Sequence, residues 1–145
     1  MTEIGRGIQG VEVDQSGGPL SGGLVHGELT NRIIGAAIQV HRELGPGFLE
    51  SIYERALAIE LSHREIPFEK QLEIPITYRD IEVGRHRLDL LIADEIVVEL
   101  KAVSALEDIH FVIVRSYLCA AKKRHALLLN FAQPTLLVKR VQAKI

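Results

Sequence analysis

The sequence is poor in cysteine and in aromatic residues. It holds one cysteine, Cys119, no tryptophan and only 5% aromatic residues. A single cysteine excludes a disulfide within the chain, and the lack of disulfides is typical of a reducing, cytoplasmic setting. Because aromatic rings are scarce, a base-stacking platform for single-stranded nucleic acid is poorly supported.

The chain also lacks a strong net charge and any long hydrophobic run. Its formal net charge is -2 and its isoelectric point about 6.3. The chain has no overall positive charge of the kind that attracts nucleic acid, so nucleic-acid binding would have to depend on a local basic patch. The N-terminus has no apolar run of signal-peptide type, and no stretch approaches the roughly 20 apolar residues of a membrane span. We therefore expect no membrane segment.

Apolar residues are nevertheless plentiful enough for one folded domain. The chain has 145 residues, of which 47% are hydrophobic. Residues 1–27 hold eight of the 12 glycines and show no sustained periodicity. This composition predicts a flexible glycine-rich arm over residues 1–27, in which Val11–Val13 could form a short strand. The domain itself is expected over residues 28–145.

Helical periodicity recurs in three segments. Apolar residues at helical spacing predict a helix over Leu29–Leu44, which Gly45–Gly47 would end, and a second over Phe48–His63. The third would begin at a capping box, Ser104–Glu107, and continue to Lys123. These three helices are expected to flank a sheet.

Strand-type sequence fills the rest of the chain. A turn at Arg79-Asp80 separates two runs, and Gly84 suggests a bulge. Continuous apolar sequence near the C-terminus is typical of a strand that is covered on both faces. The expected strands are Phe68–Gln71, Leu72–Tyr78, Ile81–Val83, Ala126–Phe131 and Thr135–Val141. With the helices they predict an α/β fold built on a mixed sheet.

The strongest strand pattern is a hairpin within His86–Val103. Successive strand residues face opposite sides of a sheet, so the apolar members of both strands should share one buried face. Those members are Leu88, Leu90, Ile92, Ile96, Val98, Leu100 and Ala102. The opposite face then carries Asp89, Glu99 and Lys101.

The length of the hairpin loop decides which of these charged residues face each other. A loop of Ala93–Glu95 sets Asp89 opposite Glu99, and a loop one residue later sets Asp89 opposite Lys101. Either register gathers two carboxylates and an ammonium. Carboxylates that face each other repel, so the arrangement favours a cation between them. A divalent ion on two carboxylates beside a lysine suits hydrolysis of a phosphodiester.

The spacing of Asp89, Glu99 and Lys101 is weak evidence on its own, because such spacings arise often by accident in a chain that is 25% charged. Other motifs in the sequence strengthen it. These further motifs occur in order along residues 28–142. They are Glu28–Thr30, Val40–Gly47, Gly47–Tyr53, Arg87–Leu91, Val98–Ala102, Tyr117-Leu118 and Leu127–Phe131. Through these motifs the sequence resembles the GxxExxY proteins, a bacterial and archaeal group of the PD-(D/E)XK nuclease superfamily.

The resemblance implies a fold, a cofactor and a set of catalytic residues. The fold would be a restriction-endonuclease-like core, a mixed central sheet flanked by helices. Mg²⁺, or Mn²⁺ in its place, would be held by Asp89 and Glu99. Lys101 would orient or deprotonate the attacking water and stabilise the negative charge on the phosphate. Glu50 would add a further acid at the metal, with Tyr53-Glu54 nearby.

The third helix departs from the family pattern at one position. Members often carry a glutamine four residues before the tyrosine of this helix, and this chain has Ile113 before Tyr117. Isoleucine cannot form a hydrogen bond, so the departure bears on activity more than on fold.

Contacts to DNA would have to come from local positive charge and from the third helix. Phosphate contacts of this kind are sensitive to salt and mostly blind to sequence. The candidates are Lys122, Lys123, Arg124, Lys139 and Arg140, together with Tyr117. A solvated helix end explains the first three equally well.

Three functions follow from these features. The first is a Mg²⁺-dependent nuclease that cleaves nucleic acid, DNA in the first place. The alternative is a catalytically inactive module of nuclease fold that binds nucleic acid or a protein partner. The third is a structural homodimer whose interface covers Asp89 and Glu99.

Overall fold

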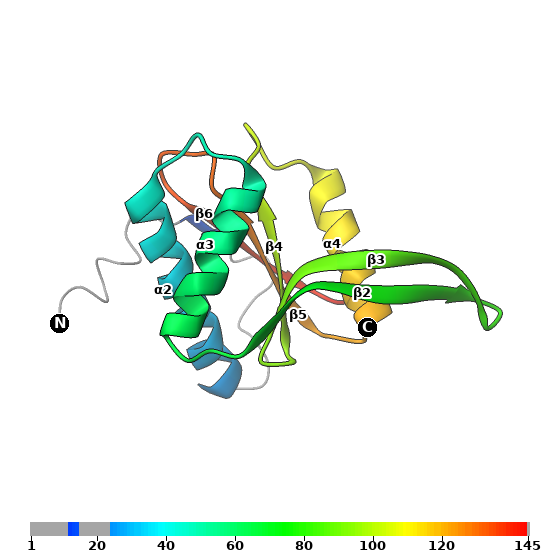
Figure 1. Cartoon of the computed structure of the whole chain (residues 1–145). Helices are drawn as coiled ribbons and strands as arrows, with labels where there is room; N and C mark the ends of the chain where they lie inside the picture. The colour runs from blue at the N-terminus through cyan, green and yellow to red at the C-terminus, as the bar shows by residue number, and fades with distance from the viewer. Residues whose placement is uncertain (1–11, 15–23, 145) are drawn as a thin grey trace.

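The structure is a computed structural model that describes residues 12–14 and 24–144, with side chains from Gly27 onward in the second range. They form a six-stranded mixed sheet with helices on both faces (Figure 1). In chain order the elements are β1 (Glu12–Asp14), α2 (Leu24–Leu44), α3 (Glu50–His63), β2 (Phe68–Tyr78), β3 (Ile81–Ile92), β4 (Ile96–Lys101), α4 (Asp108–Ala121), β5 (His125–Asn130) and β6 (Leu137–Gln142). The predicted α/β class is confirmed.

The sheet has the strand order β1-β6-β5-β4-β3-β2. Strands β4 and β5 are parallel, and so are β1 and β6, whereas the other neighbours are antiparallel. A parallel pair needs a crossover connection, which α4 provides between β4 and β5. The carboxyl ends of β4 and β5 therefore lie at the same edge of the sheet.

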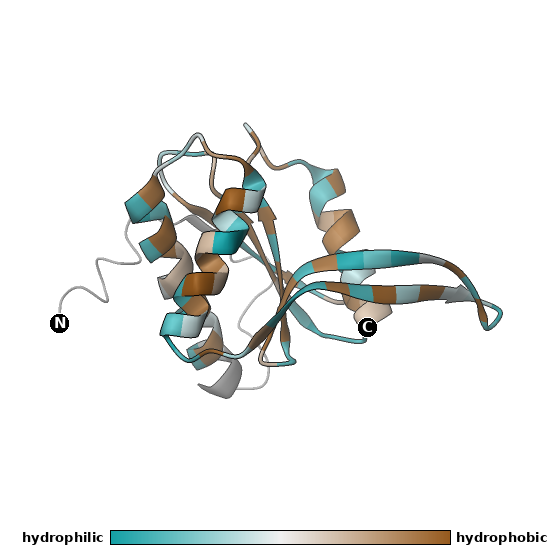
Figure 2. Cartoon of the chain, in the orientation of Figure 1, coloured by the Kyte–Doolittle hydropathy of each residue, from teal (hydrophilic) through white to brown (hydrophobic). Residues whose placement is uncertain are grey.

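The two faces of the sheet bury separate hydrophobic clusters. Helices α2 and α3 cover one face and α4 the other (Figure 1). All six residues of β5 are buried, as its continuous apolar sequence predicts. In Figure 2 the strands between the helices are largely brown, whereas the projecting part of β2 and β3 alternates brown with teal.

Several element boundaries differ from prediction. Helix α3 begins at Glu50 rather than Phe48, because Gly45 and Gly47 turn the chain with φ of 71° and 110°. Helix α2 begins at Leu24, before the expected Leu29. Strand β1 lies one residue beyond the expected Val11–Val13 and pairs with β6. The rest of the predicted arm, residues 1–11 and 15–23, lies outside the described residues.

The start of α4 corrects the sequence prediction. Ser104 does not cap a helix, and α4 begins at Asp108 with Glu107 as its N-cap. The capping box forms between Glu107 and His110, whose Nδ1 accepts the Glu107 N–H at 2.8 Å. Helix cannot start earlier because Asn130 binds the backbone of Val103 and Gln133 binds the carbonyl of Ser104. Strand β6 likewise begins at Leu137, after the predicted Thr135.

Strands β2 and β3 form a long hairpin that projects beyond the sheet (Figure 1). Its turn lies at Arg79-Asp80 as predicted, with φ of 49° and 65°. Pairing shifts where Ile76 faces Gly84 and Thr77 faces Glu82, which is the irregularity that Gly84 suggested. No helix in the described ranges has both the length and the hydropathy to cross a membrane.

Leu88 does not share the buried face predicted for it. It packs with Leu72 and Ile74 against the α4 side, whereas Leu90 and Ile92 pack under α2 and α3. Regular pairing is interrupted at this point: β3 pairs with β4 no further than Leu90, and its pairing with β2 skips Gln71 and Asp89, where Gln71 has φ of 53°. The hairpin is then free to twist across the sheet and bring its next apolar residues under α4.

Candidate active site

The hairpin between β3 and β4 has the three-residue loop Ala93–Glu95. Ile92 pairs with Ile96 and Leu90 with Val98. Continuing that register places Asp89 opposite Glu99 and excludes the alternative with Asp89 opposite Lys101. The two carboxylates therefore meet, and Lys101 lies one step further along β4 on the same side.

The site forms where β3 leaves β4. Since backbone pairing stops at Leu90, the N–H of Leu100 has no strand partner there and donates to Asp89 Oδ2 at 2.9 Å. This bond holds the Asp89 carboxylate against the edge of β4. Burial raises the pKa of Asp89, while the Leu100 N–H, Glu99 and Lys101 oppose the rise.

Glu99 is the most buried acid of the site, with 5% of the residue exposed. Its Oε2 lies 3.4 Å from Lys101 Nζ, and its buried Oε1 has no hydrogen-bond partner. Burial, reinforced by the Asp89 carboxylate, raises the pKa of Glu99 to about 8. In the metal-free protein Glu99 therefore keeps its proton at pH 7.

Glu50, in the first turn of α3, lies close enough to Lys101 and Asp89 to interact with their charges. It is half-buried, and burial raises its pKa, with Asp89 and Glu54 adding to the rise and Lys101 opposing it. An acid in a first helical turn also gains from the helix dipole. The structure thus brings Glu50 within electrostatic range of Lys101 on β4 and Asp89 on β3, and its role at a metal stays a prediction.

Glu54 lies one turn further along α3 and has its own partner. Nε2 of Gln71 donates to both Glu54 oxygens, at 2.7 and 2.9 Å. Burial raises the pKa of Glu54, and Asp89 adds to the rise. Gln71 has φ of 53°, which is unusual for glutamine. Sequence reasoning missed Gln71, because nothing in its pattern signals a strand residue that reaches a helix.

Tyr53 supports the site without entering it. It is fully buried and stacks on Phe131 with ring centroids 4.6 Å apart. Its hydroxyl donates to the Gly45 carbonyl at 2.6 Å and accepts the Phe48 N–H at 3.1 Å. The tyrosine of the Gly47–Tyr53 motif thereby fixes the loop that leads into Glu50.

Tyr117 is a residue of α4 that lies close to the site. Burial raises the pKa of its hydroxyl, and the carboxylates of Glu99, Asp89 and Glu50 add to the rise. The ring packs edge-on against His86, with centroids 4.6 Å apart. Ser116 Oγ donates to the Ile113 carbonyl and lies 3.1 Å from His86 Nε2. Sequence reasoning overlooked His86 and Ser116.

The predicted basic cluster does not gather at the acids. Lys122, Lys123 and Arg124 precede His125, which pairs with Ile96, whereas Lys101 pairs with Asn130 at the other end of the strand. Five residues of strand separate the two ends by about 16 Å. Lys123 instead pairs with Asp94 in the hairpin loop, at 3.2 Å.

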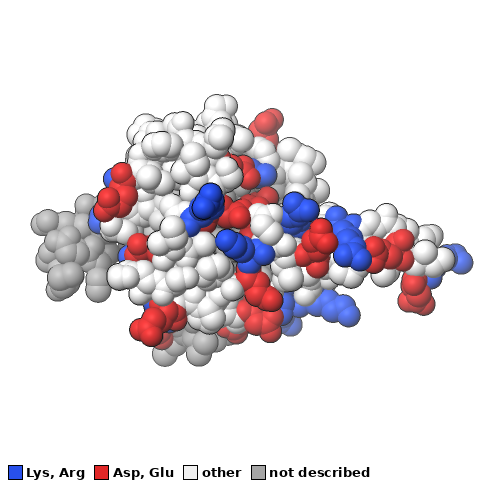
Figure 3. All heavy atoms as spheres, viewed as in Figure 1, with Lys and Arg blue, Asp and Glu red and all other residues white. Residues whose placement is uncertain are grey.

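Lys139 and Arg140 face opposite sides of the sheet. Arg140 alternates with Lys139 along β6 and shares the side of Val138, which packs under α2 and α3. Lys139 shares the side of Val141, which packs under α4. On the face seen in Figure 3, Lys and Arg are interspersed with Asp and Glu, along the projecting hairpin as well. No continuous basic surface marks that face.

The donor set fits a hard divalent cation. Carboxylate oxygens are the ligands that Mg²⁺ prefers, and it commonly takes one or two of them and keeps several waters. Asp89 and the orphaned Oε1 of Glu99 supply such a pair. Among the described residues no group of three or more His, Cys, Asp or Glu side chains is gathered closely enough to hold an ion. Glu50 therefore does not join the pair as a third direct neighbour in this structure.

A mixed sheet with helices on both faces and an acid–lysine cluster at a strand end defines the restriction-endonuclease-like α/β class. A family model described as PD-(D/E)XK nuclease superfamily matches residues 27–141. The chain belongs to this superfamily, whose members generally use divalent metals and act on nucleic acid. Comparisons with curated proteins and with solved structures give no significant match. The narrower resemblance to the GxxExxY proteins stays a prediction.

Asn130 fixes the segment that follows Lys101, and its loss should be costly. Its fully buried amide accepts from the N–H groups of Val103 and Ala132 and donates to the Val103 carbonyl. Asn130→Ala leaves these groups unpaired, at about 1–3 kcal/mol for each one that stays buried. Urea unfolding should show the loss, and exposed Asn31→Ala should show none. Equal stability of the two variants would contradict this role.

Proposed function

We propose that this chain is a metal-dependent nuclease that hydrolyses phosphodiester bonds of DNA. Asp89, Glu99 and Lys101 are the proposed catalytic residues, and Glu50 is an additional acid. The observation that carries the proposal is the buried, unpartnered Oε1 of Glu99 beside Asp89 and Lys101. Such a carboxylate is costly unless it meets a proton or a cation. Membership of a nuclease superfamily supports the same chemistry.

Each residue then has a defined task. Asp89 and Glu99 would hold Mg²⁺ or Mn²⁺, which when bound supplies a more acidic water and neutralises phosphate charge. Lys101, of which 22% of the side chain is exposed, donates hydrogen bonds to the attacking water and to a phosphate oxygen. Tyr117, whose hydroxyl is close enough to feel the carboxylates of Glu99, Asp89 and Glu50, would donate a hydrogen bond to the substrate from α4.

Cleavage of supercoiled plasmid in Mg²⁺ or Mn²⁺ tests the proposal. We expect Asp89→Asn and Lys101→Met to lower the rate about 100-fold or more, the range for loss of one group that stabilises charge in the transition state. Matched controls are Asp94→Asn and Lys144→Met, which change an exposed loop acid and an exposed terminal lysine. Cleavage that persists in Lys101→Met would show that the proposed mechanism is wrong.

A second candidate is the inactive nuclease-fold module, which Ile113 favours because the site lacks a polar group there. The same proteins separate the two functions. If Mg²⁺ and Mn²⁺ leave the thermal midpoint of the wild type unchanged, and plasmid stays intact, the catalytic proposal fails. A dimer in solution that dissociates on Asp89→Arg would instead indicate an interface over the acids.

A further inference from the structure

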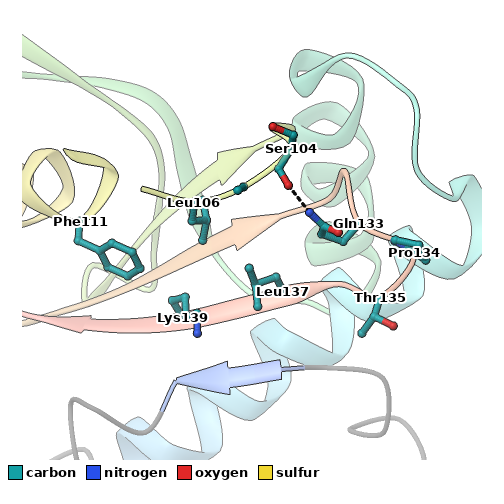
Figure 4. A pocket seen from close by; sticks show the side chains of 9 residues that line it. Ser104, Leu106, Phe111, Gln133, Pro134, Thr135, Leu137 and Lys139 are labelled. Carbon is teal, nitrogen blue, oxygen red and sulfur yellow. Dashed lines mark hydrogen bonds between the residues drawn. The ribbon is translucent and has the colours of Figure 1, made fainter. Parts of the chain in front are cut away.

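The two strands that carry the proposed catalytic residues are held in different ways. The segment after β4 is anchored just beyond the carboxyl end of the strand, where Gln133 donates to the Ser104 carbonyl (Figure 4). Asp89 lies within β3, at a point where pairing with β4 has already stopped. The position of Asp89 therefore depends on contacts from its other neighbour in the sheet, β2.

Strand β2 is irregular directly opposite Asp89. Its pairing with β3 includes the residues on either side of Gln71 and of Asp89 but omits these two. Gln71 has φ of 53°, a left-handed conformation that residues with a side chain seldom adopt. In a regular strand Leu88 and Leu90 would share one face, yet here they pack on opposite faces of the sheet. The ribbon thus twists at Gln71 and Asp89.

This twist is linked to the hydrogen bond that the Asp89 carboxylate accepts. A continued ladder would pair the Leu100 N–H with a backbone carbonyl of β3, but Asp89 Oδ2 accepts it at 2.9 Å. A side chain can replace a backbone acceptor in this way only where its own strand has left the ladder. The left-handed Gln71 on one side of β3 and the carboxylate bond on the other are therefore parts of one distortion.

Glu54 on α3 holds Gln71 in this conformation. Nε2 of Gln71 donates to both Glu54 oxygens, at 2.7 and 2.9 Å. A sparsely populated backbone conformation persists only where the surrounding structure enforces it, and hydrogen bonds to a carboxylate are among the stronger contacts available. Glu54 also lies close enough to Asp89 that the charge of Asp89 adds to the rise of its pKa. A chain of contacts thus connects α3 with Asp89 through Gln71.

We propose that Gln71 and Glu54 are positioning residues that together set the Asp89 carboxylate at the site. Gln71 acts through the left-handed conformation of its backbone, and Glu54 acts by holding the Gln71 side chain. Neither has to touch the substrate or a metal ion. The inference rests on the proposed nuclease function for its catalytic consequence alone, since the position of Asp89 can be measured without cleavage.

The Leu100 amide reports the position of Asp89 in the metal-free protein. An N–H that donates to a carboxylate has a proton NMR signal displaced downfield. At pH 7 in EDTA, we expect Gln71→Ala and Glu54→Ala each to move the Leu100 signal upfield, toward its position in Asp89→Ala. The spectra are recorded at a temperature where every variant is folded. A Leu100 signal that stays at its wild-type position in both single variants overturns the proposal.

Three further variants separate this role from a loss of stability. Gln39→Ala removes a bond of the same kind on α2, from Nε2 to Glu43 at 3.0 Å, and should leave the Leu100 signal unchanged. Glu54→Gln keeps an oxygen that accepts from Gln71, so it should retain the wild-type signal. The double variant of Gln71→Ala with Glu54→Ala should resemble the larger single change, because both disturb one contact. Additive displacements, or a Glu54→Gln signal like that of Glu54→Ala, contradict the proposed unit.

Cleavage kinetics distinguish this proposal from the proposed function. In Gln71→Ala the Mg²⁺ concentration for half-maximal cleavage should rise about tenfold, the lower end for loss of a group that orients a metal ligand. The KM for DNA should stay unchanged, because no DNA contact is removed. If the Leu100 signal moves and the wild type cleaves no DNA, the nuclease function fails and the placement of Asp89 stands. If the wild type cleaves and Gln71→Ala keeps both its Leu100 signal and its Mg²⁺ requirement, the positioning role fails.

Discussion

Glu99→Gln is expected to stabilise the metal-free protein at pH 8 and to abolish cleavage. The folded chain holds the Glu99 carboxyl where only 5% of the residue is exposed, beside Asp89. Ionising it there is unfavourable, so its pKa is about 8 against an ordinary value of 4.5. Glutamine keeps the shape, carries no charge and can donate to the Asp89 carboxylate. It cannot, however, replace the anionic ligand that the proposed metal site needs.

The pH range of the effect follows from proton linkage. Between pH 4.5 and about 8 the folded chain keeps a proton that the unfolded chain has released. Stability therefore falls as pH rises through this window, and the contribution of protonated Glu99 is lost above it. The free energy of unfolding of the wild type should fall by a few kcal/mol between pH 5 and pH 8. The scale is roughly 1.4 kcal/mol per unit of difference between the folded and unfolded pKa of Glu99, before the structure relaxes around the charge. Glu99→Gln should lose much less.

Urea unfolding in EDTA at pH 5, 6, 7 and 8 measures the difference. Glu69→Gln, at an exposed strand position, is the matched control and should follow the wild type. Parallel profiles for the wild type and Glu99→Gln would contradict the raised pKa of the buried Glu99 carboxyl. In Mg²⁺ the wild type should become more stable than Glu99→Gln, because only the wild type gains stability from the ion.

The core of the site could be predicted because it is local in sequence. Asp89, Glu99 and Lys101 lie on two strands joined by a short loop, and strand alternation alone puts their side chains together. Sequence left two registers open, and the apolar pairing of Ile92 with Ile96 decides between them. The buried strand β5 was predictable for a related reason, since a strand covered on both faces is apolar throughout.

Features that depend on distant contacts escaped prediction. Ser104 has the spacing of a capping box, yet Asn130 and Gln133, from beyond α4, hold its neighbourhood out of the helix. Leu88 changes face because β3 stops pairing with β4, which no periodicity reveals. Lys139 and Arg140 are adjacent in sequence and are both predicted DNA contacts, but a strand sends neighbours to opposite faces, so the two cannot serve one surface.

The second large effect concerns Tyr53, which joins Gly47 and Glu50 in one loop structure. Gly47 has φ of 110°, a conformation strained for other residues, and Tyr53 closes the same loop through its hydroxyl. Glu50 lies between them, so its position depends on both. We expect Tyr53→Ala to cost about 3–5 kcal/mol, as for other large aromatic truncations in a core.

Tyr53→Phe isolates the hydroxyl, because it keeps the stacking on Phe131 and removes only the bonds to Gly45 and Phe48. Leaving those backbone groups unpaired should cost about 1–3 kcal/mol in urea unfolding. It should also slow cleavage at temperatures where the protein is fully folded, since the loop no longer holds Glu50 in place. Tyr78→Phe, at the hairpin turn with 67% of the residue exposed, is the matched control. If Tyr53→Phe unfolds like the wild type, the loop is held by other contacts. If it is destabilised yet cleaves at the wild-type rate, Glu50 does not depend on the loop, and the motif's tyrosine serves stability alone.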